Sequence, residues 1–314
     1  MLVKPFQASN YKIALQSLQK RLNIRHEKAI KIEEELYLQE AGENGEKHLL
    51  TILTESQLPK NTFILHNIAI ESIIPIQIDI MLISPSWVLI VEVKNLNGEL
   101  TFLANPSQLI CVKEEKKLIY RSPEAQIDQY IFGLAKFFEQ HQMKIPIYGA
   151  IVLPYANAII DKPPSKYPLL MGRGIINHIW TLPKKEAIPF NQVVELMLNH
   201  SKELYWNYFP LSRYFGIDPM EILRGVECPN CGAIPMKRLK RTWYCEKCNT
   251  RDMRAHEKTL KEYYMLINKS ISPKEAMNFL LLRNRYEATR ILKAFCKKRT
   301  GNTRQSRYEL SLEK

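Results

Sequence analysis

Four cysteines form two close pairs in the C-terminal part of the chain. Two residues separate Cys228 from Cys231 and Cys245 from Cys248, and 13 residues separate the two pairs. Two Cys-x-x-Cys knuckles at this distance are typical of a zinc ribbon, in which four thiolates complete a tetrahedral shell around one ion. Because that shell leaves no position for a substrate, we expect this zinc to be structural. The spacing disfavours the alternative, a thioredoxin-like redox pair.

Cations and aromatic rings alternate in the segment between the two cysteine pairs. Such interleaving suits contact with the phosphates and bases of a nucleic acid. The candidate contact residues are Lys237, Arg238, Lys240, Arg241 and Trp243.

Net positive charge is confined to the same end of the chain. The 314 residues carry 45 Lys and Arg against 32 Asp and Glu, a formal charge of +13. Residues 228–314 hold 21 of these cations and 8 of the acids, whereas residues 1–227 hold 24 of each. A basic region of this kind attracts a polyanion, and we expect nucleic acid, DNA in particular, as the partner. A solubilising basic tail is the alternative.

Two carboxylates and a lysine recur within two neighbouring apolar runs. Asp79 ends a Gln-Ile-Asp motif, and Glu92 and Lys94 belong to a Glu-Val-Lys motif in the next run. A phosphodiester hydrolase needs carboxylates to hold Mg²⁺ or Mn²⁺ and a cation to position the attacking water or stabilise developing charge. The flanking Ile, Leu and Val residues predict buried strands, where charged side chains need partners or a metal. A structural ion pair is the alternative.

The spacing of these residues also predicts their geometry. If runs 75–84 and 87–94 pair antiparallel around a symmetric loop, directly opposed residues have positions that sum to 171. Asp79 then faces Glu92, and Gln77 faces Lys94. Because opposed and alternate residues share a face, the hairpin alone would gather the three charged side chains on one side of the sheet.

Three short motifs follow one another over roughly residues 40–155: Gly45-Glu46, Gln77-Ile78-Asp79 and Glu92-Val93-Lys94. In this order they resemble the nuclease-related domain (NERD) of the PD-(D/E)xK nuclease superfamily. The resemblance implies that Asp79 and Glu92 are ligands of a catalytic Mg²⁺ and that Lys94 is the catalytic lysine. It also implies that Glu46 is the acid of the first helix and a further ligand.

A polar and aromatic pair follows on a predicted helix. Gln126 and Tyr130 lie one turn apart and therefore share a helix face. The pair resembles the Gln-x-x-x-Tyr element of RecB-type nucleases of the same superfamily, which implies that Gln126 lies beside the catalytic site. An ordinary pair on an amphipathic helix is the alternative.

The elements that would position these residues describe an α/β fold. Periodicity predicts helices over 11–38, 46–56 and 124–140, strands over 62–68, 75–84, 87–94 and 147–153, and a hairpin over 98–112. We expect a PD-(D/E)xK nuclease-like mixed sheet flanked by helices, followed by a small zinc ribbon and a helical C-terminal module.

The expected domains follow from these elements. They are an N-terminal helix (1–40), a NERD-like nuclease domain (41–190), a helical linker (191–227) with a helix over 191–206, the zinc ribbon (228–250) and a basic helical module (251–314). We expect helices over 254–268, 272–283 and 286–298. The last two could form a helix-turn-helix that presents Arg283, Arg285, Arg290, Lys293, Lys297 and Lys298 to phosphate. A plain helical hairpin is the alternative, and we expect the last residues to be irregular.

The expected compartment follows from the lack of a signal-peptide pattern and from the spacing of the cysteines. No signal-peptide pattern opens the chain, and the apolar stretch 73–93 contains Gln77, Asp79, Glu92 and two prolines. We therefore expect buried strands there and no membrane partner. Cysteine spacing that favours metal over disulfides predicts a reducing, cytoplasmic location.

Together these features predict a metal-dependent nuclease that acts on DNA in DNA processing, repair or defence and is targeted by its basic zinc-ribbon region. Two alternatives stay open: a catalytically inactive nucleic-acid-binding protein, and a scaffold of a larger DNA-processing assembly. The presence of Asp79, Glu92 and Lys94 together favours the nuclease.

Overall fold

The computed structural model describes residues 1–184, 187–202, 208–301 and 306–312. The chain divides into two compact units. The first unit comprises Met1–Ala8 and Leu38–Leu204, and the second comprises Ser9–Tyr37 and Tyr205–Lys314. The finer domain boundaries expected from the sequence stay a prediction. The sequence did not predict that residues 9–37 would join the C-terminal unit.

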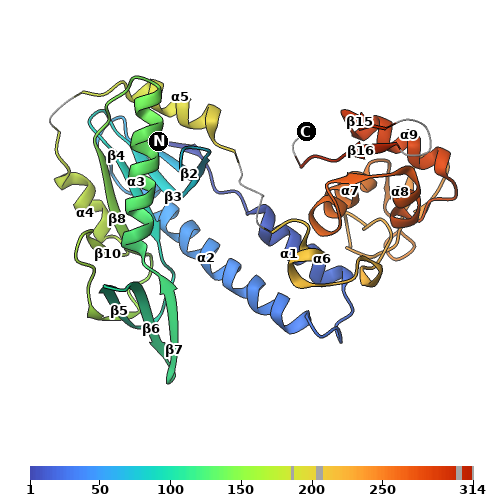
Figure 1. Cartoon of the computed structure of the whole chain (residues 1–314), viewed down its shortest axis with the longest axis horizontal. Helices are drawn as coiled ribbons and strands as arrows, with labels where there is room; N and C mark the ends of the chain where they lie inside the picture. The colour runs from blue at the N-terminus through green and yellow to red at the C-terminus, as the bar shows by residue number, and fades with distance from the viewer. Residues whose placement is uncertain (185–186, 203–207, 302–305, 313–314) are drawn as a thin grey trace. The chain divides into compact units, whose positions relative to one another are not determined.

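A six-stranded mixed sheet forms the centre of the first unit (Figure 1). Its antiparallel centre, β2–β3–β4, is extended by parallel neighbours on both sides. In spatial order the strands are β1 (Leu2–Lys4), β2 (Phe63–Ile70), β3 (Ile76–Ile83), β4 (Val88–Val93), β8 (Ile147–Leu153) and β10 (Leu169–Met171). The apolar stretch 73–93 thus forms buried strands, as predicted. No helix within the described residues has both the length and the apolar composition that crossing a bilayer requires.

Helices cover both faces of this sheet. On one face, α2 (Ala29–Glu55) and α4 (Gly174–Thr181) pack their Leu and Ile side chains against the strands. On the other, α3 (Pro123–Gln140) and α5 (Phe190–His200) pack Leu, Phe, Val and Met side chains against the strands. Ser122 caps α3, and Pro123 occupies its first turn, where a missing N–H is tolerated. The expected α/β architecture, a mixed sheet flanked by helices, is confirmed. The predicted end of the helix at Trp206 lies outside the described residues.

A second, four-stranded sheet adjoins the central one. Its strands in spatial order are β7 (Lys116–Arg121), β6 (Ser107–Lys113), β5 (Gly98–Ala104) and β9 (Ala158–Lys162). The predicted hairpin is β5–β6, whereas β7 and β9 were not predicted. Its buried face packs against Ile127 of α3 and Ile151 of β8.

The helices before the central sheet differ from the prediction. The expected single helix is broken after α1 (Asn10–Arg21), and α2 then runs unbroken through Gly42 and Gly45, where we expected an interruption. A glycine inside a helix costs only about 1 kcal/mol relative to alanine, and packing along α2 outweighs this cost.

The second unit has one core shared by helices and the cysteine-rich ribbon. The ribbon strands are β11 (Lys237–Arg238), β12 (Trp243–Tyr244) and β13 (Arg251–Asp252). The surrounding helices are α1, α6 (Leu211–Phe215), the short η1 (Pro219–Glu221), α7 (Ala255–Leu266), α8 (Pro273–Leu280) and α9 (Arg285–Phe295). The expectation of an irregular C-terminus is wrong for residues 298–300 and 307–309, because β16 (Arg307–Glu309) pairs with both β14 (Ser270–Ile271) and β15 (Lys298–Thr300).

A buried ion pair joins α1 to α7 inside this core. Arg21 Nη2 and Nε lie 2.6 and 3.0 Å from Glu262 Oε2, and neither side chain is more than 1% exposed. Arg21 Nη1 also donates to the carbonyl oxygens of Leu223 and Gly225, at 2.8 and 3.1 Å. One guanidinium therefore satisfies three acceptors from segments far apart in the sequence.

We expect Arg21→Met to lower the free energy of unfolding by about 3–5 kcal/mol, because it removes the buried guanidinium that contacts Glu262 Oε2 and leaves only Lys258, 3.9 Å from Oε1. Urea denaturation followed by circular dichroism measures this change. The double variant Arg21→Met/Glu262→Leu is the control and should recover much of the loss. A loss below about 1 kcal/mol in the single variant would contradict this role.

Candidate active site and metal centre

The β3–β4 hairpin has the register that the sequence predicted. Its pairs are Ile80↔Val91, Met81↔Ile90, Leu82↔Leu89 and Ile83↔Val88, whose positions each sum to 171. A four-residue loop closes the hairpin, and Ser84 N–H donates to the Trp87 carbonyl at 2.9 Å. The same register places Asp79 opposite Glu92, just beyond the last ladder pair.

Asp79 sits where the ladder is interrupted on both sides. The β2–β3 pairing passes from His66↔Ile80 to Ile68↔Ile78 and skips Asn67 and Asp79. Asn67 has a left-handed backbone, with φ of 49°. The Asp79 carboxylate instead accepts a hydrogen bond from Val93 N–H at 2.8 Å, which holds it against the end of β4.

Glu92 and Lys94 form the centre of the charged cluster. Lys94 Nζ lies 2.6 Å from Glu92 Oε1. Glu92 is only 2% exposed, and its second oxygen, Oε2, is buried with no hydrogen-bond partner among the described residues. A buried carboxylate oxygen without a partner is costly, so it marks a position that can accept a donor or a cation.

Glu46 reaches the cluster from α2 because the helix comes close to the end of β4. A Cβ on Gly45 would lie 2.7 Å from Asn95 Cβ and 3.2 Å from Pro154 Cγ. Asn95 Nδ2 also donates to the Ala41 carbonyl at 2.7 Å. The glycine before Glu46 therefore permits an approach that any side chain would obstruct.

His66 is the nearest partner of Glu46 and was not singled out from the sequence. Its Nε2 lies 2.7 Å from Glu46 Oε2. Burial, followed by the charge of Lys4, lowers the pKa of His66 to about 4, so the ring is neutral at pH 7 and the contact is a hydrogen bond. A lone histidine in a strand gives no sequence signal of such a role.

The carboxylates repel one another. Burial, then Glu92 and Glu46, raises the pKa of Asp79 well above its usual value. Burial, then Glu43 and Glu92, raises the pKa of Glu46 to about 8. Burial by itself would lower the pKa of Lys94, but Glu92 and Asp79 raise it above its usual value. The cluster therefore contains more acid than its single ammonium can balance.

Glu43 belongs to this acidic cluster and was missed by the sequence analysis. It is 5% exposed and precedes Glu46 by three residues on α2, so the two share a helix face. The Glu-x-x-Glu spacing was the signal that could have identified it.

Gln126 and Tyr130 lie beside the cluster from α3. The Gln126 side chain hydrogen-bonds to Tyr130, and burial followed by the charges of Glu92 and Asp79 raises the pKa of Tyr130. Gln126 Oε1 is buried without a hydrogen-bond partner among the described residues. The two residues predicted to share a helix face thus do so, next to Glu92.

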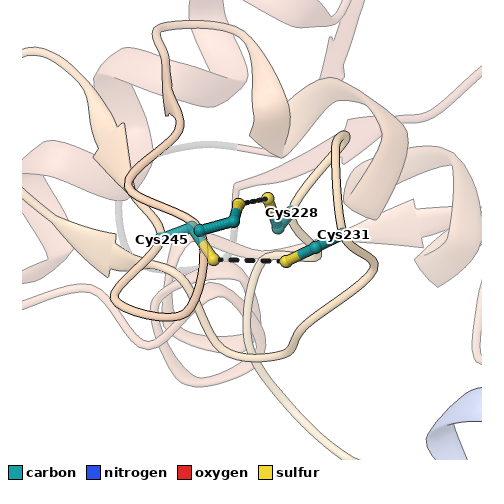
Figure 2. Close-up of side chains that lie close together, drawn as sticks. Cys228, Cys231 and Cys245 are labelled. Carbon is teal, nitrogen blue, oxygen red and sulfur yellow. Dashed lines mark hydrogen bonds between the residues drawn. The ribbon is translucent and has the colours of Figure 1, made fainter.

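The four cysteines form the second candidate site. All their sulfur atoms lie within 4.8 Å of one another. Cys228 Sγ is 3.6 Å from Cys248 Sγ, and Cys231 Sγ is 3.5 Å from Cys245 Sγ. Figure 2 shows the sulfur atoms of Cys228, Cys231 and Cys245 turned toward one another. These separations far exceed the S–S bond of about 2.05 Å and suit thiolates around one ion.

Potential metal ligands are the side chains of His, Cys, Asp and Glu. Within the described part of the chain, the ligand atoms of these four cysteines already lie close enough to hold one ion. Asp79, Glu92 and Glu46 do not form such a group. Each carboxylate is paired instead with the Val93 amide, the Lys94 ammonium or the His66 ring.

Two of the five ribbon residues expected to touch nucleic acid are used for packing. Trp243 is fully buried, and its Nε1 donates to His256 Nδ1 at 3.0 Å, so its ring cannot stack on a base. Arg238 lies 4.7 Å from the Trp243 ring centre and 2.8 Å from Glu287 Oε1. Lys237 is paired with Glu246 at 3.2 Å, whereas Lys240 and Arg241 are exposed.

Comparison with known proteins gives one match. The family model of the nuclease-related domain, NERD, matches residues 41–154. The resemblance inferred from the motifs is thereby confirmed for this segment, which contains Glu46, Asp79, Glu92, Lys94 and Gln126. No curated protein and no solved structure matches the chain.

The approach of α2 to β4 can be tested with two glycines of the same helix. We expect Gly45→Ala to destabilise the protein by about 1–3 kcal/mol, because the added Cβ meets Asn95. Gly42→Ala is the matched control, because nothing lies within 4 Å of its Cβ position. It should stabilise the protein by about 0.5–1 kcal/mol through helix propensity. Thermal denaturation measures both, and shifts of the same sign would contradict the close approach.

Proposed function

We propose that the first unit is a metal-dependent nuclease that acts on DNA, in DNA processing, repair or defence. The observation that carries this proposal is the buried, unpartnered Glu92 Oε2, which lies in a cluster where several carboxylates share the Lys94 ammonium. Most buried polar atoms in proteins have a hydrogen-bond partner, so an unpartnered carboxylate oxygen favours a bound donor or cation over a purely structural ion pair. The match of residues 41–154 to the nuclease-related domain supports the same reading.

The donor set fits a hard divalent cation. Asp79 and Glu92, with Glu46 as a further ligand directly or through water, would hold Mg²⁺ or Mn²⁺, because both ions prefer carboxylate oxygens. A bound ion of this kind would stabilise negative charge on a phosphodiester and lower the pKa of a coordinated water.

The other residues of the cluster have roles that follow from their contacts. Burial opposes the charged form of Lys94, but the neighbouring carboxylates raise its pKa above the usual value. Its ammonium would orient the attacking water or stabilise developing charge. Gln126 Oε1, buried without a partner, would accept a hydrogen bond from a water molecule near Glu92.

We further propose that the four cysteines hold zinc with a structural role. Four sulfur ligands at tetrahedral spacing select Zn²⁺ among the ions available in a cell. Cys228 and Cys245 are buried in the core of the second unit, so an ion there would connect the ribbon to the helices. Thiolates must stay reduced to bind it, which makes a cytoplasmic location part of the proposal.

We expect Asp79→Asn and Lys94→Met each to lower Mg²⁺-dependent DNA cleavage by about 10²–10³-fold, the range for removal of one electrostatic stabiliser. The assay compares linear, circular, single-stranded and duplex DNA, and RNA, with Mg²⁺, Mn²⁺ or EDTA. Asp161→Asn and Lys136→Ala, both exposed in the same unit, are matched controls and should cleave normally. Unchanged cleavage by both site variants would place the activity elsewhere. No cleavage by the parent protein would favour an inactive binding protein.

We expect protein purified without chelators to contain about one zinc ion per chain, with Zn–S distances of about 2.3 Å. Cys245→Ser should lose the metal and unfold the second unit before the first, because the ion and the core depend on each other. Metal analysis and denaturation measure both effects. Cys296→Ser, which lies outside the cluster, should keep the zinc. A parent protein free of zinc would refute the assignment.

A further inference from the structure

A groove of about 580 Å³ lies in the second unit between α7 and the segment that follows α9. We call it the basic groove. Cations line both of its sides, and an aromatic ring is part of its lining. The residues that define it are Arg254 just before α7, Glu257 and Lys261 of α7, Phe295 at the end of α9, Lys297 and Lys298 after it, and Glu309 of β16.

Positive charge in the basic groove is only partly neutralised. Arg254 Nε lies 2.6 Å from Glu257 Oε1, and Lys298 Nζ lies 3.9 Å from Glu309 Oε2. Lys261 and Lys297 form no ion pair within the described part of the chain, although they line the same groove. The groove lining carries four cations, Arg254, Lys261, Lys297 and Lys298, against two carboxylates, Glu257 and Glu309, and the net charge of +2 attracts an anion.

The charge continues outside the groove along α9. Arg290 and Lys293 are exposed and stand three residues apart, so they lie on neighbouring positions of the helix surface before Lys297. They add exposed positive charge to the helix that ends at the groove, which suits a polyanion longer than the groove itself. The ribbon offers less, since Arg238 and Trp243 serve its packing.

We propose that the basic groove binds the sugar-phosphate backbone of a nucleic acid strand. The volume of about 580 Å³ is that of a site for one small organic ligand, which is enough for part of one strand but not for a duplex. Phe295 adds an apolar surface for a sugar or base, which a site for inorganic phosphate would not need. The claim that the bound strand is a substrate rests on the proposed nuclease function. The claim that the groove binds a strand does not.

The test neutralises the two unpaired lysines in the full-length protein. Lys261→Gln/Lys297→Gln should weaken binding of a fluorescein-labelled oligonucleotide about tenfold at physiological salt, because two phosphate contacts are lost. The slope of log affinity against log salt should fall by about 1.4 on a single strand, at about 0.7 per contact. Fluorescence anisotropy in EDTA measures binding without cleavage, on single strands and on duplex.

Lys269→Gln/Lys274→Gln is the matched control, with the same change in net charge at exposed positions that do not line the groove. It should leave the salt slope unchanged. Equal weakening by both double variants would overturn the proposal, because it would show a general charge effect. The proposal would also be overturned if Lys261→Gln/Lys297→Gln weakened binding of a mononucleotide as much as binding of the oligonucleotide. The groove would then be a site for free nucleotides.

The nuclease site and the groove can fail independently. Asp79→Asn should bind the oligonucleotide normally in EDTA. The groove variant should still cleave at saturating DNA, and adding Asp79→Asn to it should abolish that cleavage. Normal cleavage by Asp79→Asn would refute the proposed nuclease site and leave the groove result standing. Normal binding by the groove variant would refute the groove alone.

Discussion

The burial of Glu92, and the partial burial of Asp79, between apolar strands is the constraint that shapes the first unit. A carboxylate removed from water is costly unless something replaces its hydration. Here a backbone amide and the Lys94 ammonium do so in part, and Glu92 Oε2 stays unsatisfied. The four-residue loop fixes the register that brings the two acids together, and Gly45 lets a third acid approach. The fold thus holds a charge imbalance that a divalent cation would relieve.

The second unit solves a similar problem with different chemistry. Arg21 is fully buried, and its guanidinium meets Glu262 and two backbone carbonyls from a distant segment. The cysteine-rich ribbon contributes to the same core through Trp243 and Cys245. Polar groups inside this core are therefore satisfied by partners that come from both ends of the sequence, which explains why α1 belongs to the C-terminal unit.

The nuclease-related segment and the rest of the chain carry different kinds of information. Residues 41–154 include the strands that hold Asp79 and Glu92 and the helix that holds Gln126. The match does not extend to α4, α5 or the second unit, where the basic groove lies. What the family implies about chemistry therefore stops at the first unit, and substrate binding by the second must be argued from its own charges.

The sequence by itself determined the local features: the β3–β4 register, the start of α3 at Pro123, and the two cysteine knuckles. Each depends on residues close together in the chain, whose spacing fixes which side chains share a face. Only the tertiary structure decided that Trp243 and Arg238 are used for packing and that His66 pairs with Glu46. It also decided that residues 9–37 belong to the C-terminal unit. Such contacts join segments far apart in sequence, and residue type alone does not say whether a cation or a ring will meet solvent or a distant partner.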